Sequence, residues 1–265
     1  NFSKTFKSNQ YTLPGTTMSV SSDSTIIVLG YDLKFTNENY NNANVAPEEN
    51  RFIKEVLLDN LNEPMELELL PDGKVIFVER GGKIKVYDQV KGEVSNIHKL
   101  NVTTKHEDGL LGIALDPNIK ENNWVYLFYS DPEKIQQNIS RFTLKDNFMT
   151  WDTTSEKVLL EIATQRDECC HSGGSLEFGP DGYLFISTGD DTNPHESDGY
   201  SPSDERKNRS PWDAQKSSAN SMDLRGKILR IKPEADGTYS IPNGNLFSKD
   251  GMLLNKDFEM GLLVK

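Results

Sequence analysis

The residues with the clearest capacity for chemistry stand together in the stretch "CCHSGG", residues 169–174. An imidazole has an ordinary pKa of about 6.5, so a histidine can accept a proton near neutral pH. Gly173 and Gly174 follow His171 after one intervening residue, Ser172. Glycine lets a backbone approach a ligand closely. We therefore expect His171 to act as a general base and Gly173 to lie against a bound ligand. A histidine with a purely structural role is the alternative.

The chain has only two cysteines, and they are adjacent, at Cys169 and Cys170. Two cysteines in a chain of this length are neighbours by chance in roughly 1 of 130 cases, so we expect their adjacency to have a role. Adjacent Cα atoms lie about 3.8 Å apart, which is closer than in most disulfides. Two free, partly buried thiols and a vicinal disulfide therefore both remain open.

Carboxylates occur where successive predicted strands begin or end. Glu107 and Asp108 precede "GLLGIALDP", and Asp190 follows the strand-like run "YLFISTG". Carboxylates at such ends can bind a divalent metal, accept hydrogen bonds from sugar hydroxyls or orient a histidine. We expect Glu107 to be a catalytic-site residue that contacts the substrate or a cofactor, and Asp190 to contribute to the site, with a simple turn cap as the alternative for Asp190. We expect Asp108 and Asp167 to be solvated loop charges.

A long polar segment, residues 192–222, separates two predicted strands. Loops of this length inside a compact domain are usually functional or disordered. The segment carries Arg206 and Arg209, and it is predicted to be a lid or a loop that grips a cofactor, with disorder as the alternative.

Three stretches repeat one pattern that predicts β-hairpins. Each has apolar residues, a turn with Pro-Asp-Gly or Asp-Pro-Asn, and a β-rich run, which is the turn chemistry of hairpins. The three predicted hairpins span residues 65–80, 111–130 and 174–190. Predicted outer strands follow at residues 82–88, 138–144 and 225–233.

Such units, repeated at intervals of roughly 45 residues with one long insertion, favour an all-β fold of the β-propeller type over a β-sandwich. About three to four blades are predicted, which is too few to close a ring. We expect residues 1–50 to be a linker or the end of a preceding domain, although residues 25–29 read as β. Residues 51–250 are expected to form the partial propeller, and residues 251–265 an atypical or truncated tail.

Composition narrows the partners of the protein. The formal net charge is −12, which disfavours nucleic acid and anionic membranes because their phosphates would be repelled. No apolar run approaches the roughly 18 residues that a membrane-spanning helix needs. We therefore expect no nucleic-acid partner and no membrane span.

Three motifs in the same order resemble the glucose/sorbosone dehydrogenase family: "DGLLGIALDPNIKENNWVYLFYS", "HSGGSLEFGPDGYLFISTGD" and "RGKILRIKPEADGTYSIPNGNLF". The resemblance covers about residues 52–247. It implies a six-bladed propeller that uses pyrroloquinoline quinone (PQQ) and calcium, a small sugar as substrate and an external electron acceptor. It also implies that His171 takes the proton of the sugar's anomeric hydroxyl, while hydride passes to the quinone and a lactone leaves.

The chain departs from the family pattern at positions that matter. Glu107 stands where glucose dehydrogenases have Gln, and Cys170 stands where they have Asp. Asn193 and Pro194 stand where an Arg-Asn pair holds the quinone; proline has no amide donor and asparagine has no charge. We expect Asn193 to remain near the cofactor and Arg206 or Arg209 to supply the missing cation. The metal ligands stay unassigned.

The cysteine pair gains a specific hypothesis by analogy with unrelated quinoprotein alcohol dehydrogenases, in which a vicinal disulfide lies against the quinone plane. Cys169 and Cys170 are expected to contact the cofactor in this way. A disulfide also favours the periplasm, the cell surface or secretion. The alternatives to a dehydrogenase are a non-catalytic propeller that binds carbohydrate or protein, and a calcium-dependent lactonase that uses metal-bound water.

Overall fold

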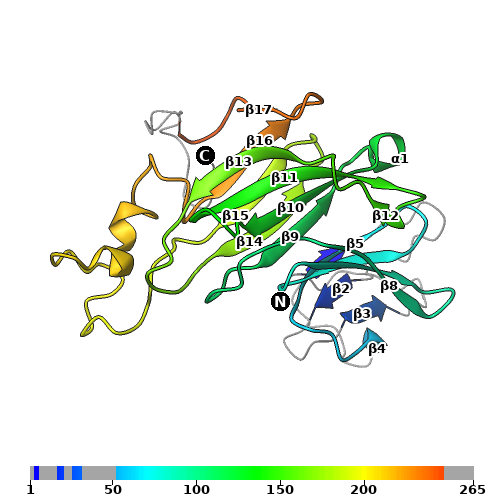
Figure 1. Cartoon of the computed structure of the whole chain (residues 1–265), viewed down its shortest axis with the longest axis horizontal. Helices are drawn as coiled ribbons and strands as arrows, with labels where there is room; N and C mark the ends of the chain where they lie inside the picture. The colour runs from blue at the N-terminus through cyan, green and yellow to red at the C-terminus, as the bar shows by residue number, and fades with distance from the viewer. Residues whose placement is uncertain (1–2, 6–16, 21–25, 32–51, 248–265) are drawn as a thin grey trace, which may run out of the picture. The chain divides into compact units, whose positions relative to one another are not determined.

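The structure is a computed structural model that describes residues 3–5, 17–20, 26–31 and 52–247, with side chains described from residue 55 (Figure 1). The chain divides into two compact units, Asn1–Pro64 and Met65–Lys265. The predicted tail, residues 251–265, lies outside the described residues.

The first unit holds one antiparallel sheet of four strands in sequential order. Its strands are β1 (Ser3–Thr5), β2 (Thr17–Val20), β3 (Ile26–Tyr31) and β4 (Phe52–Leu58). Three of these strands thus lie within residues 1–50, and the β-like run at residues 25–29 overlaps β3. The assignment of residues 1–50 to a linker or a preceding domain stays a prediction.

The second unit contains three antiparallel sheets, each built from consecutive segments of the chain. The first consists of β5 (Pro64–Leu69), β6 (Val75–Glu79), β7 (Lys83–Asp88) and β8 (Glu93–Lys99). The second consists of β9 (Leu110–Leu115), β10 (Trp124–Ser130), β11 (Gln136–Lys145), β12 (Thr150–Trp151) and β13 (Lys157–Ala163). The third consists of β14 (Gly173–Phe178), β15 (Leu184–Thr188), β16 (Ile228–Pro233) and β17 (Tyr239–Ser240).

This arrangement confirms the predicted all-β fold. Each predicted hairpin is present, as β5–β6, β9–β10 and β14–β15, and each is followed by its predicted outer strand, β7, β11 or β16. Consecutive antiparallel units of four strands, with a fifth short strand in the second unit, define propeller blades, so the chain is a partial β-propeller. The longer turn of the second hairpin includes a single helical turn, α1 (Ile119–Asn122).

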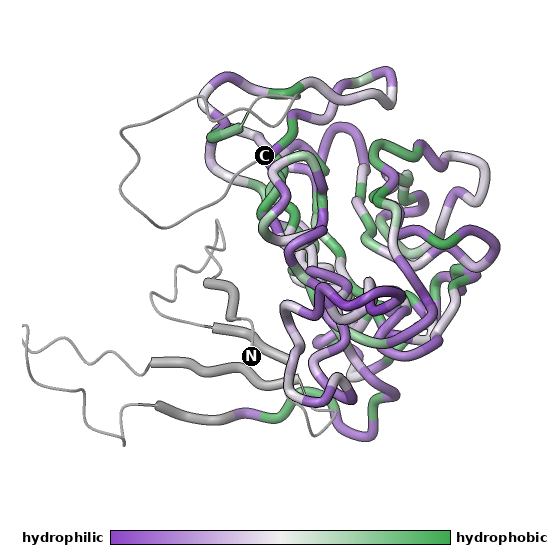
Figure 2. Tube along the Cα trace, turned by 90° about the vertical axis from the view of Figure 1, so that its left-hand side faces the viewer, coloured by the Kyte–Doolittle hydropathy of each residue, from purple (hydrophilic) through white to green (hydrophobic). Residues whose placement is uncertain are grey.

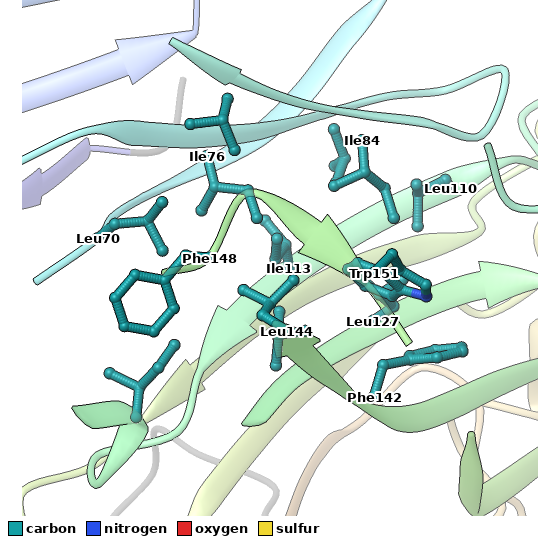
Figure 3. Close-up of a cluster of buried hydrophobic side chains, with 14 of the residues drawn as sticks. Leu70, Ile76, Ile84, Leu110, Ile113, Leu127, Phe142, Leu144, Phe148 and Trp151 are labelled. Atoms are coloured by element: carbon teal, nitrogen blue, oxygen red, sulfur yellow. The ribbon is translucent and has the colours of Figure 1, made fainter. Parts of the chain in front are cut away.

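Two apolar clusters hold the three sheets of the second unit together. Figure 3 shows the first cluster, in which Leu70, Ile76 and Ile84 meet side chains of the second sheet such as Ile113 and Leu127. The other cluster lies between the second and third sheets. The middle sheet therefore buries both faces, and the apolar run of β10 is explained because its alternate side chains enter different clusters.

Figure 2 shows short hydrophobic stretches alternating with hydrophilic ones along the described part of the trace. Among the described residues, the helical segments are too short and too polar for any of them to traverse a membrane.

Glu66, on β5, joins the first strands of all three sheets. Its carboxylate is 6% exposed. Its Oε2 accepts the backbone N–H of Ile113 on β9 at 3.0 Å, and its Oε1 accepts the hydroxyl of Ser175 on β14 at 2.9 Å. β9 and β14 also approach closely at Gly112, where a Cβ atom would overlap the carbonyl oxygen of Gly174. These contacts fix β14, the strand that follows His171.

The insertion, residues 192–222, is folded and is coloured yellow to orange in Figure 1. It contains two short 3-10 helices, η2 (Ser210–Trp212) and η3 (Ala214–Lys216). Its centre is Asp204, which is 1% exposed and accepts hydrogen bonds from Ser197, Arg206 and Arg209. These ion pairs, rather than a large apolar core, organise the insertion.

Candidate active site

The antiparallel register of β14 and β15 brings His171 and Asp190 together. Gly173 pairs with Thr188 in this hairpin. His171 lies two residues before Gly173 and Asp190 lies two residues after Thr188, so the two side chains reach the same end of the sheet. The Nδ1 atom of His171 lies 2.8 Å from Oδ1 of Asp190.

The contact with Asp190 determines which nitrogen of the imidazole can accept a proton. An ionised carboxylate only accepts hydrogen bonds, so Nδ1 of His171 must carry the hydrogen in this pair. The lone pair then belongs to Nε2. Oδ1 of Asp190 also accepts the backbone N–H of Thr192 at 3.1 Å, which fixes the carboxylate. The His171 side chain is 46% exposed, so the ring is partly open to solvent.

Glu107 contacts the backbone of His171 rather than its ring. Its Oε2 accepts the N–H of His171 at 2.6 Å and that of Ser172 at 3.4 Å. Glu107 precedes β9 of the second sheet, so two neighbouring sheets contribute to the environment of the histidine. The structure thus brings Glu107, His171 and Asp190 together.

The cysteines form a disulfide, and the described residues contain no free thiol. Of the two states left open by the sequence, the structure has the vicinal disulfide. It lies in the segment of residues 165–173, which we call the His171 loop. Two side chains hold this loop. The Gln165 amide bonds the backbone of Glu168 and also donates to Asp191, and the Glu168 carboxylate accepts a hydrogen bond from Asn193 at 2.9 Å.

Asp191 is a buried anchor that sequence analysis missed. Its Oδ2 accepts the N–H of Gln165 at 2.6 Å and a guanidinium N–H of Arg225 at 2.9 Å, and its own N–H donates to the carbonyl of His171. Burial raises the pKa of Asp191 to about 6 despite the nearby Arg225. The sequence "GDD" at the end of β15 could have indicated this role. In an antiparallel hairpin, a residue that follows β15 lies beside the segment that precedes β14, which is the His171 loop.

The expectation that Asp108 is a solvated loop charge is wrong. Asp108 is 8% exposed, and its carboxylate bonds Nε of Arg166 at 2.8 Å and the hydroxyl of Ser130 at 2.9 Å. The sequence did not indicate this burial, because the partner of Asp108 is Arg166, which lies 58 residues away in the segment between β13 and β14. Asp167 is exposed, as expected.

The remaining predicted site residues are in contact with other residues of the chain. Gly173 has a positive φ of 74°, and a Cβ atom there would overlap the backbone N of Gly189. Asn193 is 4% exposed and bonds Glu168. Arg206 and Arg209 bond Asp204, and their side chains are 40% and 27% exposed. Their roles toward a cofactor stay predictions.

The geometry therefore defines a class: a propeller of antiparallel sheets with an oriented, accessible histidine at the end of one hairpin. Comparison with known proteins agrees with that class. The family model described as Glucose / Sorbosone dehydrogenase matches residues 61–261. The chain belongs to the glucose/sorbosone dehydrogenase family.

Similar proteins include quinoprotein glucose dehydrogenase B of Acinetobacter calcoaceticus, which is 26% identical over 247 residues, covering 81% of this chain and 51% of that protein. The PQQ-bound aldose sugar dehydrogenase of Streptomyces coelicolor is similar in structure, with a TM-score of 0.52 and 26% identity over 71% of this chain and 48% of that one. The hedgehog-interacting protein of mouse is 27% identical over 71% of this chain and 27% of its own length. The chain spans about half the length of the first two curated relatives it matches.

Proposed function

We propose that the protein is a PQQ-dependent dehydrogenase that oxidises an aldose-type sugar to its lactone, with His171 as the general base. The observation that carries this proposal is the 2.8 Å contact between Nδ1 of His171 and Asp190, which leaves Nε2 as the accepting nitrogen on a half-exposed ring. Membership of a family that includes a quinoprotein glucose dehydrogenase supports the reaction class.

The residues of this chain perform the proton half of the reaction. A sugar whose anomeric hydroxyl reaches Nε2 of His171 transfers its proton there as the C1–O bond becomes the lactone carbonyl. Asp190 accepts a hydrogen bond from the Nδ1–H group of His171 and stabilises the resulting imidazolium by its negative charge. Because the carboxylate of Asp190 is also fixed by Thr192, the ring is held in one orientation.

PQQ supplies a hydride acceptor when it is bound. The residues near His171 fit the proton-accepting end of such a site, and the Cys169–Cys170 disulfide is the predicted contact for the plane of the quinone. The cofactor's carboxylates need cationic partners. Arg166 and Arg225 pair with Asp108 and Asp191, and their side chains are 13% and 15% exposed. Arg206 and Arg209 pair with Asp204, but their side chains are more open to solvent, at 40% and 27% exposed. Arg206 and Arg209 are proposed as those partners, together with contacts from Gly173, Asp190 and Asn193.

Calcium stays part of the proposal without assigned ligands. Across the portion of the chain that the structure describes, no group of three or more His, Cys, Asp or Glu side chains is arranged to hold a metal ion. The proposal also includes an external electron acceptor and a location in the periplasm, at the cell surface or outside the cell, which a vicinal disulfide favours.

The test is dye reduction by the full-length protein with PQQ and calcium across a panel of aldoses. Activity that requires PQQ and that disappears in His171→Ala supports the proposal. Lactone hydrolysis that requires calcium and proceeds without quinone would instead identify a lactonase, and it would overturn the dehydrogenase.

A non-catalytic binding propeller is the second candidate. The observation that favours it is the similarity to hedgehog-interacting protein, which is named for an interaction rather than a reaction. If the full-length protein shows no absorbance change with PQQ and no turnover, while binding a carbohydrate or a protein, this second function replaces the first.

A further inference from the structure

His171 has a backbone conformation that needs support. Its φ angle is +63°, in the left-handed region, which costs roughly 1–2 kcal/mol for a residue with a side chain. Such conformations persist where surrounding contacts over-determine them. Here the C-terminal side of the histidine is held by its own hairpin: the N–H of Asp191 donates to the carbonyl of His171, and the N–H of Gly189 donates to that of Ser172.

The backbone on the N-terminal side of His171 is held by Glu107, which precedes β9 of the neighbouring sheet. Consecutive backbone N–H groups next to a left-handed residue form a concavity that attracts an anion. The N–H groups of His171 and Ser172 both point to Oε2 of Glu107, at 2.6 and 3.4 Å. The anion in this concavity is therefore a side chain of the protein itself.

The segment that carries Glu107, residues 103–109, is arranged to present this carboxylate. One nitrogen of Arg80 donates to the backbone carbonyls of Thr104, His106 and Asp108, at 3.2, 3.3 and 2.9 Å. The Asp108 side chain is in turn bonded by Arg166. A guanidinium and a buried carboxylate thus fix the backbone on both sides of Glu107, so its position is not set by a flexible loop.

We propose that Glu107 is a positioning residue that holds the His171 backbone so that the imidazole meets Asp190 and the substrate in one orientation. This inference deepens the proposed function and rests on it for its kinetic part. It assigns Glu107 a different role from the substrate or cofactor contact expected from the sequence, because the carboxylate oxygen is directed at backbone N–H groups of another sheet.

Three variants of the full-length protein separate the possible roles. Glu107→Gln keeps an acceptor oxygen at the same reach but removes the charge. Glu107→Asp keeps the charge but withdraws the oxygen by one methylene, and Glu107→Ala removes the acceptor. Asp167→Ala is the matched control, because Asp167 is an exposed carboxylate four residues before His171.

The first readout is hydrogen–deuterium exchange in a peptide spanning residues 168–173, which needs no activity. A hydrogen bond to a carboxylate is worth about 1.5–3 kcal/mol, so we expect exchange at least tenfold faster in Glu107→Ala and Glu107→Asp. We expect a smaller change, of about three- to tenfold, in Glu107→Gln, because a hydrogen bond to a neutral acceptor is worth about 0.5–1.5 kcal/mol, and no change in Asp167→Ala. Unchanged exchange in Glu107→Ala and Glu107→Asp overturns the proposal.

The second readout is the separation of kcat from KM in sugar oxidation. Small misplacement of a reacting group costs on the order of 10²-fold in rate, so kcat should fall by that factor in the Ala and Asp variants with KM nearly unchanged. Glu107→Gln should stay within about fivefold of the wild type. A raised KM at constant kcat would make Glu107 a substrate contact, and a Gln variant as slow as the Ala variant would make it a proton carrier; either result overturns the proposal. Absence of turnover in the wild type overturns the proposed function instead, and the exchange experiment still tests the anchor.

Discussion

The His171 loop and the insertion are both polar, and both contain a histidine, carboxylates and neighbouring arginines, yet they use these groups differently. In the insertion, Asp204 is buried and gathers Arg206 and Arg209, and each guanidinium also lies over an aromatic ring, Tyr200 or Trp212. In the His171 loop, buried partners such as Asp191 bond the backbone and leave the imidazole half exposed. A polar segment therefore indicates a functional site only where an ionisable side chain remains exposed while the residues around it are hydrogen-bonded to one another.

The strongest test of this contrast replaces one histidine in each region. His171→Ala should lower kcat for sugar oxidation by about 10³-fold, because a general base contributes roughly 10²–10⁴-fold. His195→Ala, in the insertion, should leave kcat within twofold, since the hydrogen bonds of His195 come from its backbone. Dye-coupled steady-state kinetics of the full-length protein measure both. Equal losses in the two variants would break the contrast.

Asp191 lies between the two regions, and its ionisation is expected to oppose folding. Its pKa is raised from 3.8 to about 6 by burial. The folded protein keeps the proton that the unfolded chain releases, so this contribution to stability is complete below pH 3.8 and is lost as the pH rises through about 6. Asp191→Asn does not titrate, so it does not lose this stability as the pH rises. The difference in the free energy of unfolding between the variant and the wild type should therefore shift in favour of the variant by up to about 3 kcal/mol between pH 4 and pH 6.5.

Denaturant unfolding at several pH values measures this difference. Asp223→Asn is the control, because Asp223 shares Arg225 but its pKa lies below the ordinary value, so its contribution is constant across the same range. A parallel rise in both variants would assign the effect to the loss of an Arg225 partner rather than to the ionisation of Asp191.

A smaller effect is expected from the partner of the imidazole. Asp190→Asn can donate a hydrogen bond to Nδ1 and so favours the wrong tautomer of His171, which should lower kcat/KM by about 10–100-fold. Asp198→Asn is the matched change in the insertion; its side chain is 80% exposed and pairs with Arg206. No loss in Asp190→Asn would show that the orientation of His171 does not depend on this contact.

The smallest effect is expected from the arginines of the insertion. Arg206→Ala should weaken PQQ binding by only about two- to fivefold. The guanidinium is shared with Asp204 and Asp198, and it is 40% exposed, so its contact with a cofactor carboxylate would be screened by solvent. Titration of the full-length protein with PQQ, followed by absorbance, gives the dissociation constant, with the exposed Lys207→Ala as control. A loss of a hundredfold would mean that Arg206 leaves Asp204 for the cofactor.

The hairpins could be predicted from sequence because turn chemistry and strand alternation are local. The partners of Glu107, Asp108 and Asp191 could not, because each is determined by which side chain an adjacent sheet or a distant loop presents. The pairing of His171 with Asp190 was within reach, since it follows from the register of one predicted hairpin. The fold of the insertion could not be predicted, because it depends on the burial of one carboxylate, Asp204. Nothing in the sequence distinguishes Asp204 from the other acidic residues of this polar stretch.

Glu66 has a consequence for how the sheets move. Adjacent propeller blades ordinarily touch only their neighbours, so a disturbance at one interface can be absorbed there. The Glu66 carboxylate instead spans from the first sheet to Ile113 in the second and to Ser175 in the third. If one sheet slid past another, these hydrogen bonds would pull on β14, whose first residue, Gly173, lies two positions after His171. The hydrogen bonds of Glu66 thereby couple the packing of three sheets to the position of the imidazole.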